Sequence, residues 1–192
     1  LKNLKKYTFE DLKIELKEFV TYYIPTNKNS NFPTSKFYEL WKSIFYSQNY
    51  NMKNFVHKDF EFVNLFFLEN CESHLQCGII DFQSAFKGFI GWDLISLLEN
   101  PRINFTRDYN DKLIEYFYDN TSIIENFNTF LEQYYVLSLA RQTRLLGRWK
   151  KLLSTNNDNK YLNYLKITKS RTIATLNNIK NYELRSMYEK YL

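Results

Sequence analysis

The chain has 192 residues, of which 44% are hydrophobic, and its formal net charge at pH 7 is +5. This length and hydrophobic content suit one domain with a sizeable core, and the modest charge permits an anionic ligand such as a nucleotide without indicating nucleic acid. The uninterrupted apolar runs are only a few residues long and no secretory signal is visible, so we expect a cytoplasmic protein that does not span a membrane.

The first predicted element is a helix that begins after Thr8. Thr8 and Asp11 match a capping box, and apolar residues then recur every three or four positions to about residue 24. The segment 26–32 is rich in asparagine and is expected to form a turn. A second helix is predicted over residues 33–48, with a proline at its start.

The next segment carries the most informative pattern of the chain. Residues 57–64 read His-Lys-Asp-Phe-Glu-Phe-Val-Asn, which fits the catalytic-loop pattern His-x-Asp-x-x-x-x-Asn of kinase-type phosphoryl transfer. Two short strands are predicted over residues 63–68 and 76–80, joined by a turn over residues 69–75. Asp81 follows the second strand directly, where kinases carry a metal-binding Asp-Phe-Gly.

This predicted hairpin gives three side chains separate chemical roles. Asn64 lies near the start of the first strand and Asp81 at the end of its antiparallel neighbour, so both are expected at the same end of the sheet. Asp59 would orient an acceptor hydroxyl and take its proton, because an ionised carboxylate only accepts hydrogen bonds. Asn64 and Asp81 would hold Mg²⁺, which takes a few hard oxygen ligands and keeps some water.

Three further polar residues near the motif are expected to be structural or silent. His57 is expected to hold the loop through a side-chain or backbone contact rather than to tune Asp59. Asp93 is expected to be the N-cap of a helix over residues 94–99, although such an aspartate could also brace the catalytic loop from beneath. His74, in the predicted turn, is expected to be exposed and without a role.

The two cysteines flank the predicted hairpin turn. Cys71 and Cys77 have neither a Cys-x-x-Cys spacing nor a companion histidine, so no zinc site and no disulfide framework are expected. We expect two small buried thiols in a reducing compartment.

Two features of the motif indicate a small-molecule acceptor. Only residues 82–92 separate Asp81 from the next helix, which is too short for the activation segment on which protein kinases dock peptides. Glu61 stands where protein kinases usually carry a catalytic-loop lysine. We therefore expect a small-molecule acceptor together with a nucleotide.

The rest of the chain is predicted to be helical, with a loop at residues 156–159. Helices are expected over residues 108–119, 123–145, 160–166 and 172–191. Four cations share one face of the longest helix, namely Arg141, Arg144, Arg148 and Lys151. Two interpretations of this face stay open, a solvated basic surface and a patch that attracts an anionic acceptor or nucleic acid.

Several short motifs follow one another in a fixed order along the chain. They lie at residues 15–25, 57–65, 78–83, 92–98, 141–142 and 146–149. This series resembles the aminoglycoside phosphotransferase and choline kinase superfamily, and within it most closely the bacterial kinases that phosphorylate the anomeric hydroxyl of N-acetylmuramate and N-acetylglucosamine for cell-wall recycling. The resemblance implies a mainly α (α+β) fold, a protein-kinase-like C-terminal lobe in which a helical bundle carries a small β-hairpin. It also implies Asp59 as base, Asn64 and Asp81 as Mg²⁺ ligands, and ATP as the donor.

One departure concerns the nucleotide. The first glycine is Gly78, so no glycine-rich phosphate-covering loop precedes the catalytic loop in this chain. We expect residues 1–192 to be the C-terminal lobe of a longer kinase, inactive alone, with an exposed apolar surface where the nucleotide-capping lobe would dock. The alternatives are a non-catalytic kinase-like module that binds through the Arg141 face, and an aminoglycoside- or choline-type kinase.

Overall fold

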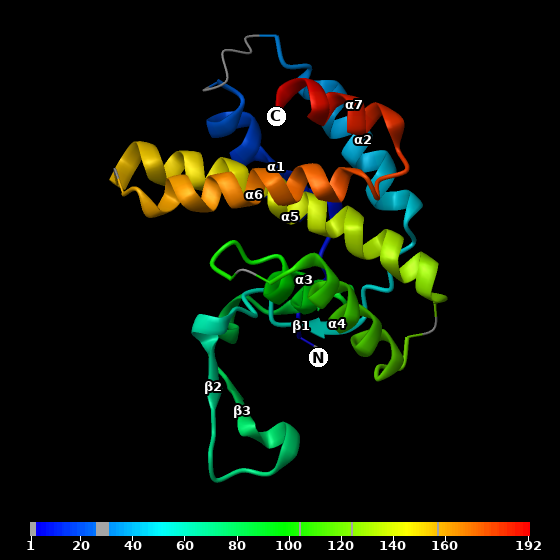
Figure 1. The fold of residues 1–192 in the computed structure, drawn as a ribbon. Coiled ribbons are helices and arrows are strands. Elements are labelled where there is room, and N and C mark those ends of the chain that lie inside the picture. The colour runs from blue at the N-terminus through cyan, green and yellow to red at the C-terminus, as the bar shows by residue number, and fades with distance from the viewer. Residues whose placement is uncertain (1–2, 26–30, 104, 124, 157) are drawn as a thin grey trace. The chain divides into compact units, whose positions relative to one another are not determined.

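The protein is mainly helical, as predicted, and carries two small two-stranded sheets in the part that is described (Figure 1). This computed structural model describes residues 3–25, 31–103, 105–123, 125–156 and 158–192. The backbone divides into two compact units: unit 1 is Leu1–Tyr7 with Tyr50–Ile123, and unit 2 is Thr8–Asn49 with Ile124–Leu192. Unit 1 contains both sheets, and unit 2 is built from helices.

The predicted hairpin is present in unit 1. Strand β2 (Leu65–Phe67) pairs antiparallel with β3 (Cys77–Ile79), and Leu65 lies opposite Ile79. The connecting turn contains a short 3-10 helix, η4 (Ser73–Gln76). In Figure 1 this hairpin projects from the rest of unit 1.

A second pair of strands was not predicted. Strand β1 (Asn54–Val56) pairs antiparallel with β4 (Phe86–Gly88). The other edge of β4 bonds the start of the chain, because the Tyr7 amide donates to the Lys87 carbonyl at 2.9 Å and the Lys87 amide donates to the Lys5 carbonyl at 2.8 Å. Three segments distant in sequence therefore meet beside the catalytic-loop motif.

Two helices complete unit 1. Helix α3 (Trp92–Leu98) has Gly91 as its N-cap, so the prediction that Asp93 caps it was wrong. Helix α4 (Arg107–Asp119) confirms the predicted element and is capped by Thr106, whose side chain accepts from a backbone amide. The core of the unit is aromatic and aliphatic, and its most buried members include Tyr7, Val56, Phe86, Phe89, Trp92, Ile95, Leu98 and Ile114.

Unit 2 consists of five α-helices and one π-helical turn in the described ranges. They are α1 (Phe9–Glu18), η1 (Phe19–Tyr23), α2 (Thr34–Ser47), α5 (Phe127–Asn156), α6 (Lys160–Leu176) and α7 (Tyr182–Tyr191). The predicted capping box of Thr8 and Asp11 is confirmed, with the Thr8 amide donating to the Asp11 carboxylate at 2.9 Å. Residues 26–30 of the predicted turn lie outside the described residues, and so does residue 157 of the predicted loop.

The predicted ends of the last helices were wrong. Helix α6 continues through the predicted break to Leu176, and α7 begins only at Tyr182. Two buried threonines explain the continuation: the Thr168 hydroxyl donates to the Tyr164 carbonyl and the Thr172 hydroxyl to the Thr168 carbonyl, each at 2.7 Å. A threonine whose hydroxyl bonds a carbonyl of its own helix can be buried in the middle of that helix without ending the helix. Helix α5 also begins later than predicted and runs further.

The face of α5 that carries the four cations is in part a packing surface within unit 2, and among the four only Arg148 is exposed. The interpretation as a wholly solvated basic surface was therefore wrong, and attraction of an anionic ligand stays a prediction. Arg141 is only 5% exposed. The others meet α1 and η1: Arg144 lies 3.9 Å from Glu15, Arg148 3.0 Å from Glu18, and the Lys151 ammonium 5.3 Å from the Tyr22 ring centre. Between these contacts Gly147 approaches the α1 backbone so closely that an added Cβ would lie 2.2 Å from the Glu18 carbonyl carbon.

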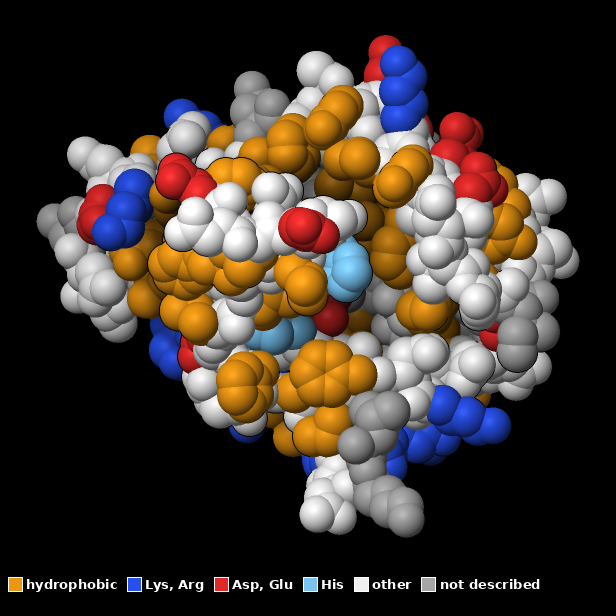
Figure 2. Space-filling model, turned by 90° about the horizontal axis from the view of Figure 1, so that it is seen from below, with side chains coloured by type: hydrophobic (Ala, Val, Ile, Leu, Met, Phe, Trp, Pro, Cys, Tyr) orange, Lys and Arg blue, Asp and Glu red, His pale blue; other side chains and the backbone are white. Residues whose placement is uncertain are grey.

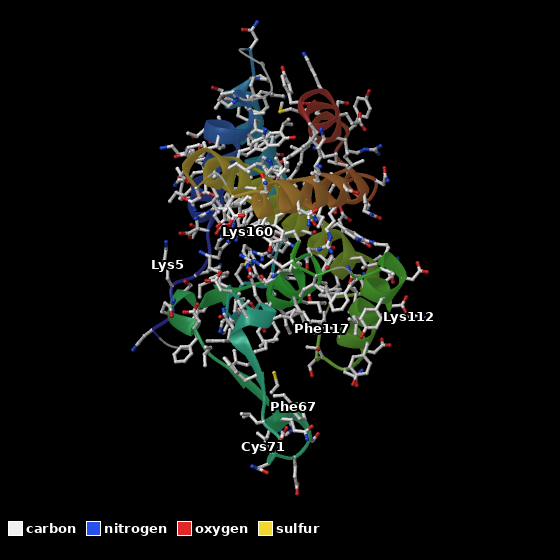
Figure 3. The ribbon with its side chains drawn as sticks, turned by 60° about the vertical axis from the view of Figure 1, so that its left-hand side comes forward. Lys5, Phe67, Cys71, Lys112, Phe117 and Lys160 are labelled. Carbon is white, nitrogen blue, oxygen red and sulfur yellow. The ribbon has the colours of Figure 1, made fainter. Side chains whose placement is uncertain are left out.

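Large apolar side chains are exposed on and beside the β2–β3 hairpin. They are Phe62, Val63, Phe66, Phe67, Leu68, Leu75, Ile79, Ile80 and Phe82. Hydrophobic side chains gather on the face that carries this hairpin (Figure 2), and Phe67 and Cys71 lie on its far part (Figure 3). The prediction of buried thiols was wrong, because Cys77 is exposed and Cys71 is partly exposed, although both are free. None of the helices in the described ranges combines the length and the low polarity that a membrane crossing requires.

Candidate functional site

Helix α3 holds the start of the catalytic-loop motif by its backbone. The carboxylate of Asp93 accepts from two successive amides, that of His57 at 2.8 Å and that of Lys58 at 3.0 Å. One turn further along α3, the Ser96 hydroxyl donates to the Lys58 carbonyl at 3.0 Å. Asp93 therefore braces the loop.

The backbone at Lys58 has an unusual conformation. Its φ is 78°, in the left-handed region that residues with a Cβ seldom adopt. Such a conformation persists only where the surroundings impose it. The bonds from Asp93 and Ser96 impose it here, one residue before Asp59.

His57 ties the loop to the second strand of the hairpin. The ring is 3% exposed, and its Nε2 lies 2.9 Å from the carbonyl oxygen of Ile80. Because a carbonyl only accepts, Nε2 is the donor of this bond. No partner for the buried Nδ1 is found among the described residues. His57, at the start of the catalytic-loop motif, is thus linked to Ile80, the residue before Asp81.

Asn64 joins the two remaining parts of the site. Its Nδ2 donates to the Asp59 carbonyl at 2.8 Å, so its Oδ1 points away from that carbonyl. Its own backbone carbonyl accepts from the Ile80 amide at 3.1 Å, which places Asn64 beside the residue that precedes Asp81. The two ends of the hairpin lie side by side, as its antiparallel pairing predicts.

Asp81 occupies a sharp turn at the end of the hairpin. Its φ of 71° and ψ of 41° are left-handed, a conformation that aspartate tolerates better than most residues. A 3-10 turn (Phe82–Ser84) follows at once, and the Asp81 side chain is exposed. The turn leads the chain away from the hairpin and leaves the carboxylate accessible beside Asn64.

The donor set at this end of the hairpin fits Mg²⁺. One amide oxygen, from Asn64, and one carboxylate, from Asp81, leave positions for water and phosphate oxygens, which is how proteins commonly hold this ion. Within the described ranges, no group of three or more His, Cys, Asp or Glu side chains is placed to hold a metal by itself.

A further charged pair lies beside Asp59 and was missed by the sequence analysis. The Glu61 amide donates to the Asp59 carbonyl at 2.9 Å, and the Glu61 carboxylate forms an ion pair with the Arg102 guanidinium. The two residues are 41 positions apart. No local pattern connects them, so only the packing of the α3–α4 connection on the loop reveals the pair.

A cavity of about 300 Å³ lies along the hairpin. It is lined by Phe62, Leu65, Phe66, Phe67, Ser73, His74, Gln76 and Cys77. His74 is exposed, as predicted, and contributes to this lining. Three of the eight lining residues are phenylalanines, and polar side chains of η4 complete the lining.

No protein-family model matches the chain, and no curated protein matches it in sequence. The superfamily resemblance stays a prediction, and the function is inferred from the residues of the chain itself.

Proposed function

We propose that this protein carries the catalytic loop of an ATP-dependent kinase that phosphorylates a hydroxyl of a small molecule, an amino sugar such as N-acetylglucosamine or N-acetylmuramate. One observation carries the proposal: the Asn64 side chain bonds the Asp59 carbonyl, and the Asn64 carbonyl bonds the amide of Ile80, the residue before Asp81. Asp93 braces the loop from α3, and His57 bonds the Ile80 carbonyl. The fold we propose is a protein-kinase-like C-terminal lobe.

Asp59 is the proposed base. Its backbone carbonyl accepts from the Asn64 side chain and from the Glu61 amide, at 2.8 and 2.9 Å, so two donors hold the backbone at this residue. A carboxylate on this backbone can align an acceptor hydroxyl with the phosphoryl group and take its proton as the new O–P bond forms and the bond from phosphorus to the leaving ADP breaks. Phosphoryl transfer asks the protein mainly for this positioning.

Asn64 and Asp81 are the proposed Mg²⁺ ligands. When bound, the ion neutralises charge on the phosphate oxygens of ATP. The protein's contribution would be an amide oxygen and a carboxylate from the two ends of one hairpin, and the bond between the Asn64 carbonyl and the Ile80 amide supports this arrangement.

The segment after Asp81 supports a small acceptor. A 3-10 turn and strand β4 fill residues 82–88, and β4 is paired on one edge with β1 and on the other with the start of the chain. Because both edges of β4 are already paired, this segment has no free strand edge on which a peptide substrate could bind. The non-catalytic alternative is less favoured, because Arg144 and Arg148 on the Arg141 face pair with Glu15 and Glu18 of α1.

The test is turnover of the full-length gene product with ATP, Mg²⁺ and a panel of amino sugars. Asp59→Ala should lower kcat by about 100-fold or more, the usual contribution of a positioned general base. Asp108→Ala, which removes an exposed carboxylate from the first turn of α4, should match the wild type. Equal turnover by the Asp59→Ala protein and the wild type would overturn the assignment.

A further inference from the structure

The connection between α3 and α4 builds a wall against the catalytic loop. Arg102 pairs with the Glu61 carboxylate. Three residues further along, Phe105 packs on Phe62, with ring centres 5.9 Å apart, and Tyr109 packs on Phe105 at 5.2 Å. An ion pair and an aromatic cluster thus lie together beside the loop that carries Asp59.

This wall is accessible to a ligand. The Arg102 side chain is 39% exposed and that of Glu61 17% exposed. Phe62 and Tyr109 are 47% and 49% exposed, although both belong to an aromatic cluster. Half-exposed aromatic rings next to a charged pair supply the combination that small-molecule sites typically use, ring surface together with a few fixed polar groups.

The wall also lies next to the proposed base along the backbone. The Glu61 amide bonds the Asp59 carbonyl, so the wall begins two residues after the proposed base. The proposed Mg²⁺ ligand Asn64 bonds the same carbonyl with its side chain, and Asp81 follows on the hairpin. A molecule held on the wall would therefore lie close to the loop that carries Asp59.

The chemistry of the pair selects the kind of acceptor. A guanidinium only donates hydrogen bonds and a carboxylate only accepts them, and their charges cancel within the pair. A hydroxyl both donates and accepts, so neighbouring hydroxyls of a neutral sugar can bridge Glu61 and Arg102 without separating them. An anionic acceptor would have to displace Glu61 from Arg102, and a polycation would have to displace Arg102 from Glu61.

We propose that Glu61, Arg102, Phe62 and Phe105 form the acceptor subsite, and that it takes a neutral polyhydroxyl ring of the N-acetylglucosamine type in preference to an acidic sugar or an aminoglycoside. This inference rests on the proposed kinase function. The pair binds hydroxyls and the rings contact the apolar face of the sugar. Arg102 and Glu61 are thus specificity-determining residues.

The experiment measures kcat and KM of the full-length gene product for N-acetylglucosamine, N-acetylmuramate and kanamycin. Arg102→Gln, Glu61→Gln and Phe105→Ala should each raise the KM for N-acetylglucosamine by about tenfold or more, since a lost charged hydrogen bond or ring contact is worth about a factor of ten. The KM for ATP should change less than twofold. Lys112→Gln and Tyr116→Ala, at exposed positions of α4, are the matched controls.

The outcomes separate the two proposals. A wild type that phosphorylates sugars, with subsite variants whose sugar KM equals that of the controls, overturns the subsite and leaves the kinase intact. A lower kcat with unchanged sugar KM also overturns it, because it shows that the pair only positions the loop. Preference for N-acetylmuramate or kanamycin overturns the neutral acceptor, and a wild type without turnover overturns both proposals. If Arg102→Gln does not fold, Arg102→Lys is used instead. It keeps the positive charge but lacks the planar guanidinium with its several N–H donors, so it should still raise the sugar KM.

Discussion

Asp93 shows how one side chain can set the geometry of a loop that it does not belong to. Its two carboxylate oxygens each take one amide, from His57 and from Lys58. The left-handed backbone at Lys58 is held by this pair of bonds together with Ser96. The position of Asp59 therefore depends on a residue of α3.

Replacing Asp93 by asparagine should loosen the loop. The amide has one accepting oxygen where the carboxylate has two, so one backbone N–H would face an NH₂ group, and we expect a loss of about 2 kcal/mol in the free energy of unfolding. Asp108→Asn, which changes the matching first-turn residue of α4, should leave it unchanged. Urea titration of both variants measures the difference, and a loss equal to that of the control would show that the two bonds contribute nothing.

Tyr188 provides a second prediction at this scale, in unit 2. The ring is 2% exposed, its hydroxyl lies 2.5 Å from the Thr143 hydroxyl, and burial raises its pKa above that of a free tyrosine. A raised pKa in the folded state means that stability is complete below about pH 10 and falls as the pH rises beyond it.

Tyr188→Phe removes this ionisable group from the folded core. The variant should lose about 1 kcal/mol at neutral pH, yet its melting temperature should fall less than that of the wild type between pH 9 and 11. Tyr182→Phe, at a residue that is 77% exposed, should keep the wild-type slope. Identical slopes for all three proteins would contradict the assignment of the alkaline loss to Tyr188.

Among the elements, α5 depends on a single glycine for its approach to α1. A Cβ at residue 147 would lie 2.2 to 2.4 Å from backbone atoms of Glu18 and Phe19, which cannot move aside as a side chain can. The contacts of Arg144 and Arg148 flank this crossing point. The crossing therefore requires that residue 147 have no side chain.

Gly147→Ala should separate α5 from α1 and cost about 3 kcal/mol or more in the free energy of unfolding, at the upper end for overpacked cores. Gly78→Ala is the matched control, because its Cβ would meet only the flexible Leu68 side chain at 3.3 Å. Chemical denaturation compares the two. An equal and small effect of both substitutions would show that α5 does not pack as closely as described.

The elements that sequence reasoning predicted are those fixed by nearby residues. The capping box at Thr8 and the hairpin between β2 and β3 each involve short separations, and both were found. The β1–β4 pair joins two three-residue segments that lie far apart in the sequence. Such segments are too short to show an alternation of apolar and polar residues from which a strand could be predicted. The same limit explains the misreading of Arg144 and Arg148, since their partners lie on α1.

The candidate site follows the same division. The spacing of His57, Asp59 and Asn64 is a local pattern and could be read directly. The ion pair of Glu61 with Arg102 depends on how the α3–α4 connection returns to the loop. It could therefore not be predicted from the sequence. For Asp93 the residue was identified correctly, but its partner is set by tertiary packing, so N-capping and bracing could not be separated beforehand.

At the scale of the whole molecule, the β2–β3 hairpin is the feature that governs behaviour in solution. Both of its strands have an unpaired edge within the described residues, and its faces carry exposed apolar side chains, with Phe67 71% exposed. Open strand edges and large apolar patches promote association between molecules.

The 192-residue chain alone should therefore self-associate as its concentration rises, and Phe67→Glu should reduce that association, because a charge on the hairpin face opposes both apolar burial and strand pairing. Tyr182→Glu places the same charge on a 77% exposed residue of α7 and should leave the association unchanged. Sedimentation velocity over a hundredfold range of concentration distinguishes the three proteins. A monodisperse wild type across that range would show that the hairpin face needs no cover, and it would remove the main physical reason to expect a further lobe on that side of the chain.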